Sequence, residues 1–254
     1  MTLLERVQKR EFSAIARMIS RVERGAPGVY QDLADLYRHG GHLRVVGIAG
    51  PPGTGKSTLV AALAASIRAR GQSVGILAID PTSPVHGGAI LGDRIRMAGL
   101  SGDEEVFIRS MATRGCLGGL SHATADAVTV LDGAGFDVAL VETVGVGQDE
   151  VEVADLVETT VVVSVPGLGD DIQALKAGLL EIADIHVVNK ADLPGAGATI
   201  ADLKNTLRLV DPVPGAWNPP VLEVTAARGE GISDLLATID SHLNWMEETG
   251  ALER

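Results

Sequence analysis

Short apolar runs rich in valine and isoleucine recur along the chain from residue 44 onward. Most of these runs lack the polar alternation of a half-exposed strand, a pattern typical of strands that are buried on both faces of a parallel sheet. The predicted strands cover residues 44–49, 74–79, 106–110, 138–141, 160–165, 185–188 and 221–224.

Helical patterns lie between most of the predicted strands, over residues 57–70, 121–132, 171–182, 200–210 and 232–246. Alternating strands and helices predict a doubly wound α/β domain with a mostly parallel sheet. Ligands of such sheets bind beyond the carboxyl ends of the strands, so the residues that follow each strand are the candidates for chemistry.

The first 39 residues show a different pattern, with apolar positions three and four residues apart. This spacing predicts helices, which the sequence Gly-Ala-Pro-Gly at 25–28 interrupts and the pair Gly40 and Gly41 ends. We therefore expect an N-terminal helical module over residues 1–42, the α/β domain over residues 43–246 and a short C-terminal tail over residues 247–254.

The composition narrows the functional classes. Of the 254 residues 46% are hydrophobic and the formal net charge is −12, which predicts a sizeable core and no broad electrostatic footprint for nucleic acid or an anionic membrane. No apolar run approaches the length of about 18 residues that a membrane span needs. The single cysteine, Cys116, excludes a disulfide framework and most zinc sites, and it fits a reducing cytosol, so we expect a cytoplasmic protein.

A phosphate-binding motif follows the first predicted strand. Residues 50–57 read Gly-Pro-Pro-Gly-Thr-Gly-Lys-Ser, which matches G-x-x-x-x-G-K-[ST], and a helical pattern comes directly after them. The glycines let backbone N–H groups turn toward a triphosphate, Lys56 supplies charge for the β- and γ-phosphates, and the Ser57 hydroxyl is placed to ligate Mg²⁺. The alternative is an ordinary glycine-rich turn. The predicted nucleotide-binding residues here are Gly50, Pro51, Pro52, Gly53, Thr54, Gly55, Lys56, Ser57 and Thr58.

A second motif, Asn189-Lys190-Ala191-Asp192, follows the predicted strand 185–188. The Asp192 carboxylate can accept hydrogen bonds from guanine N1–H and the 2-amino group, whereas adenine would leave it unpaired, so the motif predicts a guanine site. Asn189 can bind the other edge of the base, and the stem of Lys190 can cover its face. Alone, the tetrapeptide could be a simple strand-to-helix turn. Predicted backbone contacts to the base, or else a plain strand end, are Thr225, Ala226 and Ala227.

Three carboxylates are candidates for a magnesium site together with Ser57. Asp80 and Glu142 follow predicted strands, and Asp93 lies in the glycine-rich segment 87–94. Mg²⁺ takes oxygen ligands, few of them from protein and several from water, so carboxylates at strand ends near the phosphate loop suit it. Each of them could instead cap a helix or be a surface charge.

The segment after Glu142 reads Thr-Val-Gly-Val-Gly-Gln and has the features of a switch. The Gly145 N–H is a candidate donor to the γ-phosphate, and loss of that contact after hydrolysis would release the loop. Gln148 is a candidate for positioning the attacking water. The predicted catalytic residues are Lys56, Asp93, Glu142, Gly145 and Gln148. Arg94, Arg96 and Arg114 are candidates for stabilising transition-state charge, or else solvated or core-bracing arginines.

Together these residues resemble the MeaB/ArgK branch of the metallochaperone-type P-loop GTPases. The resemblance runs from Val29 to the C-terminus and rests on segments 50–58, 80–84 (DPTSP), 87–97 (GGAILGDRIRM), 107–121 (FIRSMATRGCLGGLS), 142–150 (ETVGVGQDE), 166–176 (PGLGDDIQALK) and 189–192 (NKAD). It implies Mg²⁺-dependent hydrolysis of GTP to GDP and phosphate, with Asp80, Asp93 and Glu142 as the metal and catalytic carboxylates.

The resemblance also implies partners. Members of this family act as chaperones of adenosylcobalamin-dependent acyl-CoA mutases, chiefly methylmalonyl-CoA mutase. They gate delivery of the cofactor from its adenosyltransferase and protect the mutase from inactivation, and residues 166–176 resemble the mobile loop that couples nucleotide state to the mutase. Relatives continue into a helical arm that forms their homodimer. Because this sequence ends at Arg254, we expect that arm to be missing, and dimerisation stays open.

Three other functions stay open from the residues. A nickel metallochaperone GTPase would share the fold, but such proteins usually carry cysteine and histidine metal motifs, and this chain has one cysteine and no suitable histidine pair. A phosphotransferase, as the ArgK label suggests, would release a phosphorylated acceptor in place of free phosphate. A nucleotide-binding module without turnover would bind GTP stoichiometrically.

Overall fold

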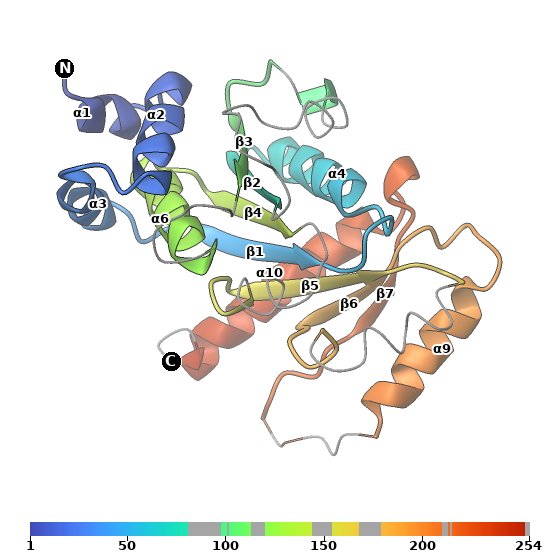
Figure 1. Ribbon diagram of the computed structural model, residues 1–254. Coiled ribbons are helices and arrows are strands. Elements are labelled where there is room, and N and C mark those ends of the chain that lie inside the picture. The colour runs from blue at the N-terminus through green and yellow to red at the C-terminus, as the bar shows by residue number, and fades with distance from the viewer. Residues whose placement is uncertain are drawn as a thin grey trace.

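A seven-stranded sheet organises the computed structural model, which describes residues 1–80, 98–100, 102–112, 120–143, 154–167, 179–209, 213 and 215–251 (Figure 1). The strand order is β3-β2-β4-β1-β5-β6-β7, and all strand pairs in the sheet are parallel. The strands are β1 (Arg44–Ala49), β2 (Val74–Asp80), β3 (Val106–Ala112), β4 (Val138–Thr143), β5 (Thr159–Ser164), β6 (Ile185–Val188) and β7 (Val221–Glu223). The predicted α/β fold is confirmed.

The seven predicted strands are all present, and their ends shift by at most two residues. The central strands β4 and β5 are buried along their whole length. Because side chains on both faces of these strands are covered, the sequence shows continuous apolar runs in place of alternation.

Helices cover both faces of the sheet (Figure 1). On one face, α4 (Lys56–Ala69) and α10 (Ile232–Thr249) share a core with β1, β4 and β5. On the other face lie α6 (Leu120–Gly133) and α9 (Ala196–Leu207). Helix α9 begins four residues before the prediction, directly after Gly195, and α10 continues three residues past the predicted end at 246. Among the described helices, none has the length and apolar character needed to cross a membrane.

The helix predicted over residues 171–182 is wrong at its end. Residues 171–178 lie outside the described residues, and residues 179–182 form a turn and a bend. Leu179, Leu180 and Ile182 pack against Ala49, Val162 and Ala183 from this turn. The apolar side chains predicted for one face of a helix therefore pack against the core from a turn, where they are partly buried.

The N-terminal residues form α1 (Leu3–Gln8), α2 (Phe12–Glu23) and α3 (Val29–Tyr37). The break between α1 and α2 is not predicted by the apolar spacing. It is centred on Arg10, which has a φ of 58°. The Arg10 guanidinium reaches the carbonyl oxygens of Ala134 and Gly135 and lies 4.9 Å from the ring centre of Phe136, so this turn is held against the end of α6.

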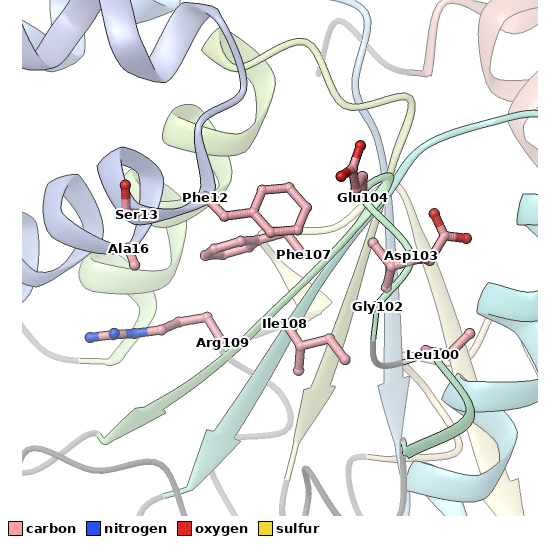
Figure 2. Close-up of a pocket in the computed structure, with 11 residues that line it drawn as sticks. Phe12, Ser13, Ala16, Leu100, Gly102, Asp103, Glu104, Phe107, Ile108 and Arg109 are labelled. Carbon is pink, nitrogen blue, oxygen red and sulfur yellow. The ribbon is translucent and has the colours of Figure 1, made fainter.

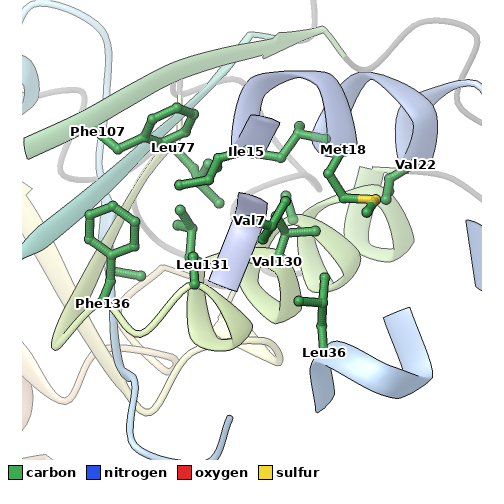
Figure 3. Packing of buried hydrophobic residues seen from close by; sticks show 14 of the residues in the cluster. Val7, Ile15, Met18, Val22, Leu36, Leu77, Phe107, Val130, Leu131 and Phe136 are labelled. Atoms are coloured by element: carbon green, nitrogen blue, oxygen red, sulfur yellow. The ribbon is translucent and has the colours of Figure 1, made fainter. Parts of the chain in front are cut away.

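The N-terminal helices and α6 enclose a shared core on one side of the sheet (Figure 3). Ile15 and Met18 of α2 and Leu36 of α3 are fully buried with Val130 and Leu131 of α6. At the C-terminal end of α6, the Asp132 carboxylate accepts the backbone N–H groups of residues 41, 42 and 43. This contact fixes the entry into β1, the strand that leads to the phosphate motif.

Candidate nucleotide-binding site

The predicted phosphate loop connects the end of β1 to the first turn of α4. Gly50 has a φ of 141° and Gly55, the residue before α4, has a φ of 89°, which are conformations that residues with side chains rarely adopt. A Cβ on Gly50 would collide with the carbonyl oxygen of Val163, and a Cβ on Gly55 would lie 2.6 Å from Nδ2 of Asn189. Both positions therefore require glycine for the loop to close.

The side chain of Lys56, the first residue of α4, folds back into this loop. Its Nζ donates to the carbonyl oxygens of Gly50 at 2.6 Å and Pro51 at 3.1 Å, and the residue is only 6% exposed. The ammonium thus lies at the N-terminus of α4, where the helix dipole also favours an anion. Of the other predicted contacts, Thr54 is buried, whereas Pro52, Gly53 and Thr58 are exposed.

Ser57 and Glu142 are the predicted metal ligands whose side chains the structure describes. The Ser57 Oγ donates to Oε1 of Glu142 at 2.6 Å, and both residues are buried. They meet because β1 and β4 are neighbours, with Ile48 opposite Glu142 in the register. A hydroxyl and a carboxylate in contact are oxygen donors of the kind that Mg²⁺ prefers.

The remaining metal and switch candidates are only partly placed. Asp80 ends β2, which pairs with β4, but its side chain lies outside the described residues. Asp93, Gly145 and Gln148 also lie outside them. The same holds for Arg94, Arg96 and Arg114, and for residues 168–176 of the segment expected to couple to a mutase. Of the predicted catalytic set, the structure therefore describes Lys56 and Glu142, and Glu142 contacts Ser57, the residue that follows Lys56.

Asn189 joins the phosphate loop to the loop after β7. Its Nδ2 donates to the carbonyl oxygen of Thr54 at 2.8 Å, and its Oδ1 accepts the N–H of Ala226 at 3.1 Å. The residue is 2% exposed. Sequence reasoning predicted a contact between Asn189 and the base; the geometry gives its amide the role of a brace between two loops that are far apart in sequence.

Lys190 and Asp192 continue from this brace toward the surface. Lys190 has a φ of 55°, and its Nζ donates to the carbonyl oxygen of Gly53 at 2.9 Å, so its stem runs from the base motif to the phosphate loop. The Asp192 carboxylate lies 3.1 Å from the guanidinium of Arg228. Sequence reasoning missed Arg228, because its pairing with Asp192 depends on the return of the chain after β7.

The loop after β7 is folded on itself. Thr225 donates its N–H to the carbonyl oxygen of Glu230 at 3.0 Å. Gly231 has a φ of 78°, and a Cβ there would collide with the carbonyl oxygen of Glu223. With Thr225 and Ala226 donating within the protein, Ala227 is the exposed member of the three predicted base contacts.

Three titratable groups with large pKa shifts lie away from this site. Burial raises the pKa of Asp184 to about 6 and lowers the pKa values of His186 and His242 to about 4. Asp184 directly precedes β6, and His242 lies on α10. Both are near the amino ends of the strands, and His242 Nδ1 lies 2.9 Å from the Thr159 hydroxyl at the start of β5. These groups support the fold rather than the nucleotide site.

An open cavity of about 670 Å³ lies along β3, an edge strand of the sheet (Figure 2). Phe12 and Ala16 of α2 line one side, and Leu100, Ile108 and Arg109 contribute to the rest. No residue of the phosphate loop or of the base motif lines it. The site defined by the motifs is therefore separate from this cavity.

Comparison with known proteins identifies a family that matches nearly the whole chain. Residues 15–254 match the family described as methylmalonyl Co-A mutase-associated GTPase MeaB. A protein of Pyrococcus abyssi that is named as a GTPase is 51% identical over 253 residues, which are 99% of this chain and 78% of that protein. The mitochondrial methylmalonic aciduria type A homolog of Mus musculus is 38% identical over 210 residues, 82% of this chain and 51% of that protein.

A solved structure agrees with the fold. The crystal structure of a LAO/AO transport system kinase matches with a TM-score of 0.81 and 26% identity, over 99% of this chain and 77% of that chain. The resemblance predicted from the sequence segments is thereby confirmed. The chain is a P-loop GTPase and belongs to the MeaB family of methylmalonyl-CoA mutase-associated GTPases.

Proposed function

We propose that this chain binds GTP with Mg²⁺, hydrolyses it to GDP and phosphate, and uses the two nucleotide states to act on an adenosylcobalamin-dependent acyl-CoA mutase, with methylmalonyl-CoA mutase as the first candidate. The observation that carries the nucleotide part is the Asn189 brace between Thr54 and Ala226. A nucleoside triphosphate has to reach a phosphate loop and a base loop at once, and this brace holds the two in one frame.

The phosphates would bind at Lys56 and at the backbone N–H groups of residues 50–58. Charge grows on the phosphate oxygens as the γ-phosphoryl group leaves, so donors that are fixed in advance stabilise the transition state more than the ground state. The buried position of Lys56 strengthens this effect, because its charge is shielded from water.

Guanine would be recognised by Asp192, with the stem of Lys190 over the ring and Ala227 beside it. The contact from Lys190 to Gly53 already spans the distance between the base and phosphate loops. An adenine ring offers the Asp192 carboxylate an acceptor in place of a donor, so it would be rejected.

The described residues fit a magnesium ion. Because the Ser57 hydroxyl donates its proton to Glu142, the lone pairs of its oxygen are left for a cation. Ser57 and Glu142 would hold the ion, with Asp80 and Asp93 as further candidate ligands. When bound, Mg²⁺ neutralises charge on the β- and γ-phosphate oxygens.

The catalytic roles of Asp93, Gly145 and Gln148 are part of the proposal. Gly145 would sense the γ-phosphate through its N–H, and Gln148 would orient the attacking water. Turnover by the chain alone should be slow, because the sequence gives no arginine an assured place at the γ-phosphate, and a partner is expected to raise it.

Family membership supports the choice of client. The family description names methylmalonyl-CoA mutase, and the name of the mouse relative refers to methylmalonic aciduria. A cobalamin adenosyltransferase is the second candidate partner, and a homodimer is the third assembly to test. We propose that this activity takes place in the cytoplasm. We also propose three parts of the chain: a helical module over residues 1–42, the GTPase domain over residues 43–246 and a tail over residues 247–254.

One other function has a specific observation in its favour. The solved structure with a TM-score of 0.81 is titled a transport system kinase, and a kinase would transfer the γ-phosphoryl group to an acceptor other than water. Product analysis separates the two reactions. Free phosphate equal to the GDP formed supports hydrolysis, and a phosphorylated acceptor supports the kinase.

The proposal is tested by measuring GTP turnover and mutase binding together. We expect magnesium-dependent release of phosphate, a higher rate when a candidate mutase is added, and co-purification with that mutase that differs between GDP and a non-hydrolysable GTP analogue. Equal co-purification in both states would contradict the switch, and absence of phosphate release would contradict the GTPase activity.

A further inference from the structure

Arg228 is the charged partner of the base-recognition carboxylate in the described part of the chain. Its Nη2 lies 3.1 Å from Oδ2 of Asp192. The side chain of Arg228 is 61% exposed and that of Asp192 is 29% exposed, so the pair lies at the mouth of the site and not in the core. The Asn-Lys-x-Asp motif does not contain this arginine.

The local fold determines where Arg228 stands. It is the last residue of a 3₁₀ helix, Ala226–Arg228, and its N–H donates to the carbonyl oxygen of Thr225 at 2.9 Å. Gly229 follows with a φ of 73° and turns the chain back to the Thr225–Glu230 bridge. Since Asn189 also binds Ala226, Asp192 and Arg228 are attached to the same braced unit.

We propose that Arg228 is a positioning residue that holds the Asp192 carboxylate in the orientation that guanine requires. This inference rests on the proposed function. Guanine needs both carboxylate oxygens in the plane of its ring, where its N1–H and 2-amino donors point. The terminal torsion of an aspartate side chain has broad, shallow preferences and does not by itself set this orientation. A partner that fixes this torsion in advance reduces the ordering that nucleotide binding would otherwise require.

The geometry favours positioning over competition. A guanidinium and the N1–H and 2-amino edge of guanine present the same pair of donors, so an arginine that gripped both oxygens would block the base. The ion pair involves Oδ2. Each carboxylate oxygen has two lone pairs, so Oδ2 can stay in this ion pair and still accept a hydrogen bond from the base.

The expected effect is modest, because exposed ion pairs are screened by water. The measurement is equilibrium binding of GDP, of inosine diphosphate, which lacks the 2-amino group, and of ADP. We expect Arg228→Ala to weaken GDP binding about two- to fivefold and to weaken inosine diphosphate binding less, so that the ratio between the two affinities falls. Arg228→Lys should restore part of the loss. Arg38→Ala is the matched control, since Arg38 is 65% exposed and pairs with Asp35 away from the site.

A double-mutant comparison completes the test. Adding Arg228→Ala to Asp192→Asn should cause no further loss of GDP affinity, because the carboxylate that Arg228 orients is already gone. An unchanged ratio of GDP to inosine diphosphate affinity in Arg228→Ala, or tighter GDP binding, would overturn the inference while the guanine site stands. If the unaltered chain shows no preference for GDP over ADP, the guanine site itself fails and the inference fails with it. Thermal unfolding checks that each variant is folded, and Arg228→Gln replaces the alanine variant if that one is not.

Discussion

The carboxyl ends and the amino ends of the strands, called here the carboxyl edge and the amino edge of the sheet, use similar polar side chains for different purposes. At the carboxyl edge, Glu142 accepts a hydrogen bond from the Ser57 hydroxyl, and Asn189 joins two loops. At the amino edge, carboxylates accept backbone N–H groups where strands begin: Glu158 binds Val45, and Asp184 binds Thr160.

The difference lies in what each group can still bind. A carboxylate that accepts a backbone N–H at the start of a strand satisfies that donor and stabilises the fold. A carboxylate beside a hydroxyl and a glycine-rich loop lies next to groups that bind phosphate and Mg²⁺. The end of the strand at which a carboxylate lies, and not its residue type, therefore separates carboxylates that stabilise the fold from those that lie in the candidate site. Substitutions at the carboxyl edge should change activity, and those at the amino edge should change stability.

The largest effect is expected for Lys56→Ala at the carboxyl edge. Removing the cation from the phosphate loop should lower GTP hydrolysis by about 100-fold or more, measured as phosphate release. Arg70→Ala, which breaks an ion pair with Asp240, is the control and should leave hydrolysis unchanged. Full turnover by the Lys56 variant would remove the phosphate loop from the mechanism.

A pair of glutamates sharpens the comparison. Glu142→Gln should slow magnesium-dependent hydrolysis about tenfold or more while changing GDP affinity little, because the lost charge serves the metal and the reacting phosphate. Glu158→Gln at the amino edge keeps an acceptor for the Val45 N–H and should leave hydrolysis unchanged. Equal rates in the two variants would break the distinction between the edges.

Asp132 tests the amino edge directly. Asp132→Ala removes the acceptor of the N–H groups of residues 41, 42 and 43. We expect the free energy of unfolding to fall by about 2 kcal/mol, measured by urea denaturation, with hydrolysis per folded molecule retained. Asp35→Ala on the exposed surface of α3 is the control. A loss of activity without a loss of stability in Asp132→Ala would show that the junction before β1 acts on the site.

The smallest effect is the pH dependence of stability. The pKa values of His186 and His242, about 4 against an ordinary 6.5, favour the neutral forms in the folded state, so stability is lost as the pH falls from 6.5 toward 4. Asp184, with its pKa raised to about 6, acts in the opposite direction, because its contribution is lost as the pH rises through 6.

Two histidines outweigh one aspartate in this window. The net change between pH 7.5 and pH 5 should be a loss of about 1–2 kcal/mol in the free energy of unfolding. His186→Leu should reduce that loss, because His186 is buried in β6 and no longer titrates in the variant. Urea denaturation at the two pH values measures both, and a loss unaffected by the substitution would assign the effect to other groups.

The sequence predicts the sheet well because burial on both faces leaves a direct pattern. The strand ends lie within two residues of the prediction, and the phosphate loop lies between β1 and α4 as expected. Predictions fail where tertiary contacts decide the conformation. The turn at Arg10 is held by the end of α6, and Leu179, Leu180 and Ile182 pack against the core from a turn and not from a helix.

Within the site, residue types were predictable but their partners were not. The motifs identify Lys56, Ser57 and Asp192 as candidates without a structure. The brace from Asn189 to Thr54 joins residues 135 positions apart, and the pairing of Asp192 with Arg228 depends on the loop after β7. No local pattern carries such information, because it depends on which strands become neighbours in the sheet.

The central claim is that this edge of the sheet recognises guanine through Asp192. The most direct measurement is the affinity of the unaltered chain and of Asp192→Asn for GTP, ATP and xanthosine triphosphate. Because an asparagine amide can donate to the 2-carbonyl of xanthine, we predict micromolar GTP binding with rejection of ATP by the unaltered chain, and a shift toward xanthosine triphosphate in the variant. A GTP-over-ATP preference that is the same in both proteins, or no micromolar binding of GTP by the unaltered chain, would contradict the account.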